Sequence, residues 1–116
     1  MDNAAVANKY LTQGIMKGFW NIHILHHAAE KPLYAPGMAE ELREHGYAAS
    51  PAALHPMLRN MERLGWLKTV KPPARSWRRY KDYRLTQAGR RVLDVLTRQV
   101  KGLHREIVCE PASHSF

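Results

Sequence analysis

The stretch "SPAALHPMLRNMERLGWLKTVKPPARSWRRYKDYRLT", residues 50–86, decides the fold. It opens with a helix, because Ser50 is a good N-cap and Pro51 suits the first helical position. Apolar residues recur on one face of this helix and are expected to be buried: Leu54, Met57, Leu58, Met61 and Leu64. Gly65 ends the helix, since glycine accepts the left-handed conformation. Pro56 removes one backbone hydrogen bond, so we expect a bend near the helix start.

Two short strands follow this helix. Residues 66–71 (WLKTVK) and 79–86 (RYKDYRLT) are rich in aromatic and β-branched residues, which favour strands. Residues 72–77 (PPARSW) lie between them and predict the turn of a hairpin. The helix is therefore expected to lead directly into a two-stranded hairpin.

Further helices are predicted on both sides of this unit. Upstream, residues 12–29 carry apolar residues at helical spacing, and a short helix over 38–46 ends at a glycine. Downstream, Thr86 is the N-cap of a last helix from 87 to about 108. The order helix, helix, helix, strand, strand, helix predicts a helix-turn-helix followed by a wing.

The chain is therefore expected to be mainly α with a small β-hairpin: a winged helix-turn-helix joined to a C-terminal dimerisation helix. We predict a flexible N-terminal segment over 1–11 and the winged helix-turn-helix DNA-binding domain over 12–86. The dimerisation helix is expected over 87–108, followed by a flexible tail over 109–116.

The charge of the chain is concentrated in one region. The 116 residues carry a formal net charge of +8 and a pI of about 10.0, which indicates an anionic partner. Residues 59–91 hold 11 Lys and Arg against 2 Asp and Glu, so this region has a net charge of +9 and the remainder −1. A charge run is often only a solvated face, but solubility needs no such concentration.

Other classes of protein fit the sequence poorly. No apolar run approaches the roughly 18 residues of a membrane span, and the N-terminus lacks an apolar signal core. Cys109 is the single cysteine, which excludes an intrachain disulfide and fits a reducing compartment. No glycine-rich phosphate loop, carboxylate pair or nucleophile with its base is visible. We expect a cytoplasmic protein with no membrane partner, no enzymatic activity and no cofactor.

Two segments, "SPAALHPMLRNMERLGWLKT" and "RRYKDYRLTQAGRRVL", resemble the PadR family of winged-helix transcriptional regulators. That family shows a Leu-Tyr-Pro step, a Leu-x-x-Leu-Glu-x-x-Gly-Leu segment, and a strand with an arginine that ends in Tyr-x-Leu-Thr-x-x-Gly. The corresponding residues here are Leu54, His55 and Pro56; Leu58, Met61, Glu62, Gly65 and Trp66; and Arg79, Tyr83, Leu85, Thr86 and Gly89. The resemblance covers about residues 15–103, and His55 departs from it by replacing the tyrosine. The single C-terminal helix is similar to the compact branch of the family.

Candidate DNA contacts lie on the third helix and the wing. They are Ser50, Ala52, Ala53, His55, Arg59, Asn60, Arg63, Arg75, Arg78, Arg79 and Lys81. The wing arginines suit phosphate or minor-groove contact, and the small alanines allow close approach to bases. Arg59 suits either a guanine or a phosphate, and the sequence leaves both roles open.

The last helix carries more apolar surface than a domain of this size needs to cover. Its stripe consists of Val92, Leu96, Val100, Leu103 and Ile107. Pairing in a homodimer would bury the stripe and imply a palindromic operator in double-stranded DNA. The alternative is that this helix packs only on its own domain. The family resemblance implies the dimer, with repression as the default and a small-molecule effector.

Sensing functions have weaker support in the sequence. Phe19 and Trp20 are a candidate effector pocket or simply core. His23 and His27, with His26 beside them, are one helical turn apart, but with no acid or cysteine nearby we predict no metal site. His104 and Cys109 are five apart, a poor fit to one helix face. The remaining alternatives are a metal- or redox-responsive winged helix, or a nonspecific nucleic-acid-binding, RNA-binding or protein-interaction one.

Overall fold

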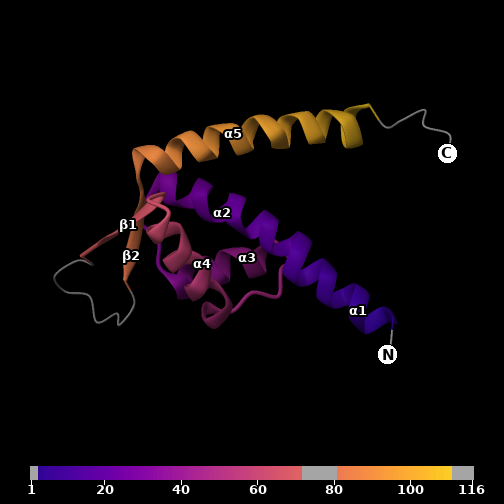
Figure 1. The fold of residues 1–116 in the computed structure, drawn as a ribbon, viewed down its shortest axis with the longest axis horizontal. Helices are drawn as coiled ribbons and strands as arrows, with labels where there is room; N and C mark the ends of the chain where they lie inside the picture. The colour runs from indigo at the N-terminus through magenta and orange to yellow at the C-terminus, as the bar shows by residue number, and fades with distance from the viewer. Residues whose placement is uncertain (1–2, 72–80, 111–116) are drawn as a thin grey trace.

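The computed structural model describes residues 3–71 and 81–110. The elements run in the predicted order, with helical extensions at both ends (Figure 1). They are α1 (Asn3–Tyr10), π-helical η1 (Leu11–Met16), α2 (Lys17–Glu30), α3 (Ala35–Glu44), α4 (Pro51–Arg63), β1 (Leu67–Val70), β2 (Asp82–Leu85), α5 (Gln87–His104) and π-helical η2 (Arg105–Cys109). This confirms the mainly α fold with one small antiparallel hairpin. In the described part of the chain, no helix is long and apolar enough to cross a membrane.

The predicted helix ends are confirmed by their hydrogen bonds and dihedral angles. The Ser50 side chain accepts a bond from the amide of Ala53 at 3.2 Å, which caps α4. Gly46 and Gly65 follow α3 and α4 with φ of +92° and +82°, a conformation that favours glycine. The helix α4 continues through Pro56, whose missing amide lies early in the helix.

The N-terminal helical arm begins earlier than predicted. The chain is helical from Asn3 onward rather than from Thr12, over most of the segment 1–11 for which a flexible chain was expected. Only four of the eight residues of α1, three alanines and Lys9, are strong helix formers, and the segment shows no strong apolar periodicity, so the sequence pattern does not reveal this helix. At the end of η1, the amide of Lys17 donates to the carbonyl of Thr12, the i to i−5 bond of a π-helix.

The central helix α2 organises the core. It packs against α3, α5 and β2 (Figure 1). The buried face of α2 consists of Trp20, Ile24, Leu25 and Ala28. The helix α4 contributes Leu54, Leu58 and Met61, as predicted. The prediction that Leu64 is buried is wrong: its side chain is 52% exposed, because it lies at the C-cap where the chain turns toward β1.

A third segment extends the hairpin by one residue pair. Leu33, just after α2, exchanges backbone hydrogen bonds with Tyr83 of β2 at 2.9 and 2.8 Å. A single pair leaves no periodic pattern in the sequence, so this bridge was not predicted. It ties the chain between α2 and α3 to the sheet.

The start of α5 lies directly against the chain that leaves α4. The Thr86 hydroxyl accepts a bond from the Gly89 amide at 3.0 Å, the predicted N-cap, and donates to the Gly65 carbonyl at 2.5 Å. A Cβ atom on Gly89 would collide with the Trp66 carbonyl and lie 2.6 Å from Cδ1 of Leu85. Gly89 is therefore required for close approach, not for an unusual dihedral angle.

We expect Gly89→Ala to lower the free energy of unfolding by about 2 kcal/mol or more, because the added methyl group meets backbone atoms that cannot move aside. Chemical denaturation of the full chain measures this change. The matched control is Gly102→Ala, in α5 with nothing within 4 Å of the added Cβ, which should stabilise by up to about 1 kcal/mol. Equal stability of the Gly89 variant and the wild type would contradict the packing argument.

Candidate nucleic-acid interface

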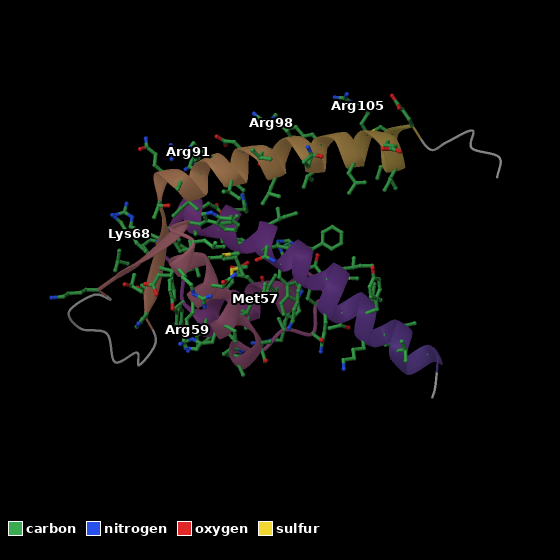
Figure 2. All side chains as sticks on the ribbon, in the orientation of Figure 1. Met57, Arg59, Lys68, Arg91, Arg98 and Arg105 are labelled. Carbon is green, nitrogen blue, oxygen red and sulfur yellow. The ribbon has the colours of Figure 1, made fainter. Side chains whose placement is uncertain are left out.

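The outward face of α4 is polar and basic. His55, Arg59, Asn60 and Arg63 are exposed on it, opposite the buried apolar residues of the same helix. At the helix start Ser50 and Ala52 are exposed, and Ala53 is half-buried. Figure 2 shows Arg59 pointing away from α5. Every residue predicted on this helix as a DNA contact therefore lies wholly or partly at the surface.

Arg59 lies close enough to β2 to influence its buried tyrosine. Burial raises the pKa of the Tyr83 hydroxyl, the Glu62 carboxylate adds to the rise, and the Arg59 guanidinium opposes it. Within residues 3–71 and 81–110, Arg59 forms no ion pair with a carboxylate. Its charge is therefore available to an external anion.

The hairpin adds cations that form no ion pair with an acid of residues 3–71 and 81–110. Lys68 and Arg84 lie directly opposite each other in the antiparallel register, and both are exposed. Like charges directly opposite each other are destabilising, and an anion bound beside the pair would relieve their repulsion. Sequence reasoning missed this pair, although the strand register would have revealed it. The predicted contact Lys81 is also exposed, beside β2.

The predicted wing contacts Arg75, Arg78 and Arg79 lie outside the described residues. The two strands that carry the wing are in place on either side of this segment.

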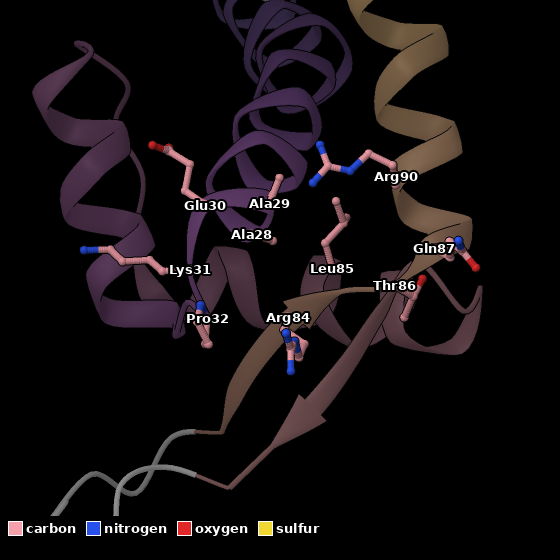
Figure 3. Close-up of a pocket in the computed structure, with 10 residues that line it drawn as sticks. All are labelled: Ala28, Ala29, Glu30, Lys31, Pro32, Arg84, Leu85, Thr86, Gln87 and Arg90. Atoms are coloured by element: carbon pink, nitrogen blue, oxygen red, sulfur yellow. The ribbon is translucent and has the colours of Figure 1, made fainter.

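A basic pocket of about 420 Å³ lies where the end of α2, the end of β2 and the start of α5 meet (Figure 3). Lys31, Arg84 and Arg90 contribute three cations to its lining, against the single acid Glu30. Sequence reasoning missed it because three separate segments build it. The pocket continues the basic surface of the hairpin onto α5.

The candidate effector residues line one hollow. Phe19 and Trp20 border a space of about 440 Å³ together with Leu11, Met16 and Tyr47. Trp20 is also core, with only 2% of its surface exposed, whereas Phe19 is 38% exposed. The buried indole Nε1 of Trp20 has no hydrogen-bond partner among the described residues.

The apolar stripe of α5 is only half covered by its own domain. Val92 and Leu96 pack against the core, but Val100, Leu103 and Ile107 are exposed. The arm formed by α1, η1 and α2 carries a second exposed stripe. Its members are Val6, Tyr10, Leu11, Ile15 and Phe19. The two arms diverge from the hairpin toward the chain ends (Figure 1).

The structure corrects the expectation that no acid lies near the histidines of α2. Glu30 does lie nearby, with its Oε1 3.3 Å from Nε2 of His26 and from Nδ1 of His27. His45, at the end of α3, also meets His23 and His27, a contact between elements that spacing does not reveal.

His104 and Cys109 do share a helix face, contrary to the prediction. The Cys109 Sγ lies 3.5 Å from Nδ1 of His104. The reason is the π-helical turn η2, which makes residues five apart neighbours.

Comparison with known proteins agrees with this arrangement. Residues 24–95 match the model of the transcriptional regulator PadR-like family. The chain is 37% identical over 87 residues to the transcriptional regulator Rv3488 of Mycobacterium tuberculosis, covering 75% of this chain and 80% of that protein.

Solved structures share the fold at low sequence identity. A PadR-like regulator of Bacillus cereus, BC4206, aligns with a TM-score of 0.72 and 18% identity, over 85% of this chain and 92% of that one. The regulator TA0346 of Thermoplasma acidophilum aligns with a TM-score of 0.68 and 20% identity, over 88% and 98% of the two chains. With its winged helix-turn-helix, its basic α4 and these matches, the chain belongs to the PadR-like family of transcriptional regulators.

Proposed function

We propose that this regulator is a cytoplasmic, homodimeric repressor that binds a palindromic operator and is released by a small aromatic effector. The observation that carries the DNA-binding part is the exposed face of α4, whose arginines have no carboxylate partner among the described residues. This face lies beside a hairpin whose cations oppose each other across the strands. A repressor of this kind acts by occupying the operator.

Affinity comes mainly from phosphate contacts. Each phosphate neutralised by Lys or Arg releases counterions, which contributes roughly −0.9 to the slope of log affinity against log salt. Lys68, Lys81 and Arg84 on the hairpin are suited to this role because they are exposed. We assign the same role to the wing arginines Arg75, Arg78 and Arg79, on their sequence position alone.

Base recognition falls to the outward face of α4. Ala52 and Ala53 leave room for close approach, and Asn60 and Arg63 extend the polar face toward the helix end. Arg59 reaches either a guanine edge or a phosphate. A bidentate contact with guanine would contribute about 1–3 kcal/mol of discrimination.

The two divergent arms supply the dimer interface in this proposal. The radius of gyration is 16.5 Å, whereas a compact chain of this length has about 13 Å. A second copy that covers both exposed apolar stripes would remove them from water. Twofold symmetry would then place two α4 helices about 34–36 Å apart, one turn of DNA.

The hollow beside Phe19 and Trp20 is the proposed effector site. It lies between the arm and the turn that leads into α4, because Tyr47 and Ala48 of that turn line it together with Leu11. Phe19 belongs both to this lining and to the exposed stripe of the arm. An occupant would therefore contact the dimerisation arm and the helix-turn-helix at once.

Removing both arginines of α4, in Arg59→Ala with Arg63→Ala, should weaken operator binding at least about tenfold. The matched control removes two arginines from the outer side of the C-terminal helix, Arg98→Ala in α5 with Arg105→Ala at the start of η2, and should bind within about threefold of wild type (Figure 2). A gel-shift salt series on the operator and a scrambled duplex measures both variants.

The pattern of loss separates the two roles of Arg59. A loss on both duplexes with a flatter salt slope indicates phosphate contacts, whereas a loss confined to the operator indicates base contact. Equal weakening by the α4 and α5 pairs would contradict the assignment of α4.

We expect Leu103→Glu to turn the dimer into a monomer, because a charge would be buried in the interface. The dimer Kd should rise at least about 100-fold. Light scattering after gel filtration should report 13.3 kDa for the variant and twice that mass for the wild type. The control Lys101→Glu introduces the same side chain outside the apolar stripe and should remain dimeric. A monomeric wild type would overturn the dimer proposal.

The effector site is testable with 4-hydroxycinnamate as a probe of planar phenolic ligands. Calorimetry should show binding to the wild type and roughly tenfold weaker binding to Phe19→Ala, which loses one aromatic wall. Tyr10→Ala is the control, since Tyr10 is 70% exposed on the same arm and does not line the hollow. Equal binding by the Phe19 and Tyr10 variants would place the ligand elsewhere.

A further inference from the structure

Three imidazoles meet where the helix-turn-helix packs on α2. His23 and His27 lie one turn apart on α2, and His45 lies at the C-cap of α3. The ring centroid of His23 lies 4.7 Å from that of His45 and 6.5 Å from that of His27. One ring nitrogen from each of the three lies within 4.8 Å of the others.

We propose that these three histidines bind one divalent transition-metal ion of the Zn²⁺ class. Neutral imidazoles suit Zn²⁺, Co²⁺, Ni²⁺ and Cu²⁺, while harder ions prefer oxygen ligands. Three protein ligands leave the fourth tetrahedral position open to water or another small ligand. The three histidines lie outside the outward face of α4, and His45 also belongs to the lining of the hollow beside Phe19 and Trp20.

The cluster needs only a small closure to reach coordination geometry. Tetrahedral ligands at about 2.0–2.1 Å from zinc have nitrogens about 3.3 Å apart. His23 is held by Tyr47, whose ring lies edge-on at 5.4 Å. His45 is exposed, so its side chain has room to rotate, and in this proposal that rotation brings the third nitrogen inward.

One member of the cluster, His23, has a lowered pKa. Burial lowers the pKa of His23, and the neighbouring His45, His27 and His26 lower it further. The neutral imidazole of His23, which is the form that ligates a metal, is therefore favoured.

The Glu30 carboxylate lies behind the His27 ligand. Its Oε1 lies 3.3 Å from Nδ1 of His27, which leaves Nε2 of that ring for the metal. A carboxylate behind a histidine ligand fixes its tautomer and orientation and raises its basicity.

A rival cluster shares His27. His26, His27 and Glu30 also converge, but all three lie within one turn of α2, and His26 and Glu30 are exposed. The pairing of His26 with Glu30 at i and i+4 is explained as an ordinary ion pair on a helix surface. The cluster with His45 instead joins two helices around the half-buried His23, which is why we assign the ion there.

A bound ion would restrain the turn that positions α4. His45 directly precedes the turn between α3 and α4, whereas His23 and His27 belong to the central helix. Metal binding would therefore fasten the helix-turn-helix to α2. An effect of metal on operator affinity rests on the proposed function, but the site itself does not.

The test uses the untagged full-length chain, freed of metal with a chelator, and no DNA. Calorimetry with Zn²⁺ should give one ion per chain, and Co²⁺ should give the intense visible absorption of a tetrahedral complex. His45→Ala and His27→Gln should each weaken Zn²⁺ binding more than about 100-fold. Glu30→Gln should weaken it roughly tenfold, because the His27 ring loses the carboxylate that orients it.

The matched controls are two other histidine variants. His26→Ala removes an exposed imidazole from the same helix, and His55→Ala removes one from α4; both should keep the wild-type Kd within about threefold. The proposal fails if the wild type binds no Zn²⁺ or if His45→Ala binds as tightly as wild type. A loss in His26→Ala as large as in His45→Ala also overturns it, in favour of the rival cluster. Because His45 is exposed, its removal leaves the fold intact, and loss of binding is attributable to the ligand.

Discussion

The close approach of Gly89 to the backbone of Trp66 sets the geometry of this molecule. It allows the first turn of α5 to lie on the chain that leaves α4, and the Thr86 hydroxyl closes the same junction by bonding to the Gly65 carbonyl. The end of α4, the start of β1 and the start of α5 therefore share one fixed point. In a dimer formed through α5, this junction would fix the distance between the α4 helices of the two subunits.

Much of the fold was predictable because its signals are local. Ser50 and Thr86 cap their helices through contacts only three residues away, and Gly65 stands where a left-handed residue is needed. The strands follow from short runs of β-branched and aromatic residues. Local rules of this kind act on neighbours in the chain, so one sequence is enough to apply them.

What escaped prediction depends on contacts between distant segments or on a change of helical period. The bridge from Leu33 to Tyr83, and the meeting of His45 with His23, require the tertiary fold. The basic pocket around Arg84 and Arg90 is assembled in the same way. The contact of Cys109 with His104 needed a π-helix, which ordinary helical spacing does not anticipate. The candidate DNA contacts of α4 were predictable because the buried face of an amphipathic helix also defines the outward one.

The π-helical turn η1 has a consequence for the shape of the arm. In a regular helix, Tyr10 and Ile15 would point in different directions, whereas a turn with bonds between residues five apart makes them neighbours. Both side chains are exposed, and they continue the line from Val6 to Phe19. The wider turn thus accommodates one extra residue, and the exposed apolar stripe stays on one side of the arm. A partner could then lie flat against it without following a twist.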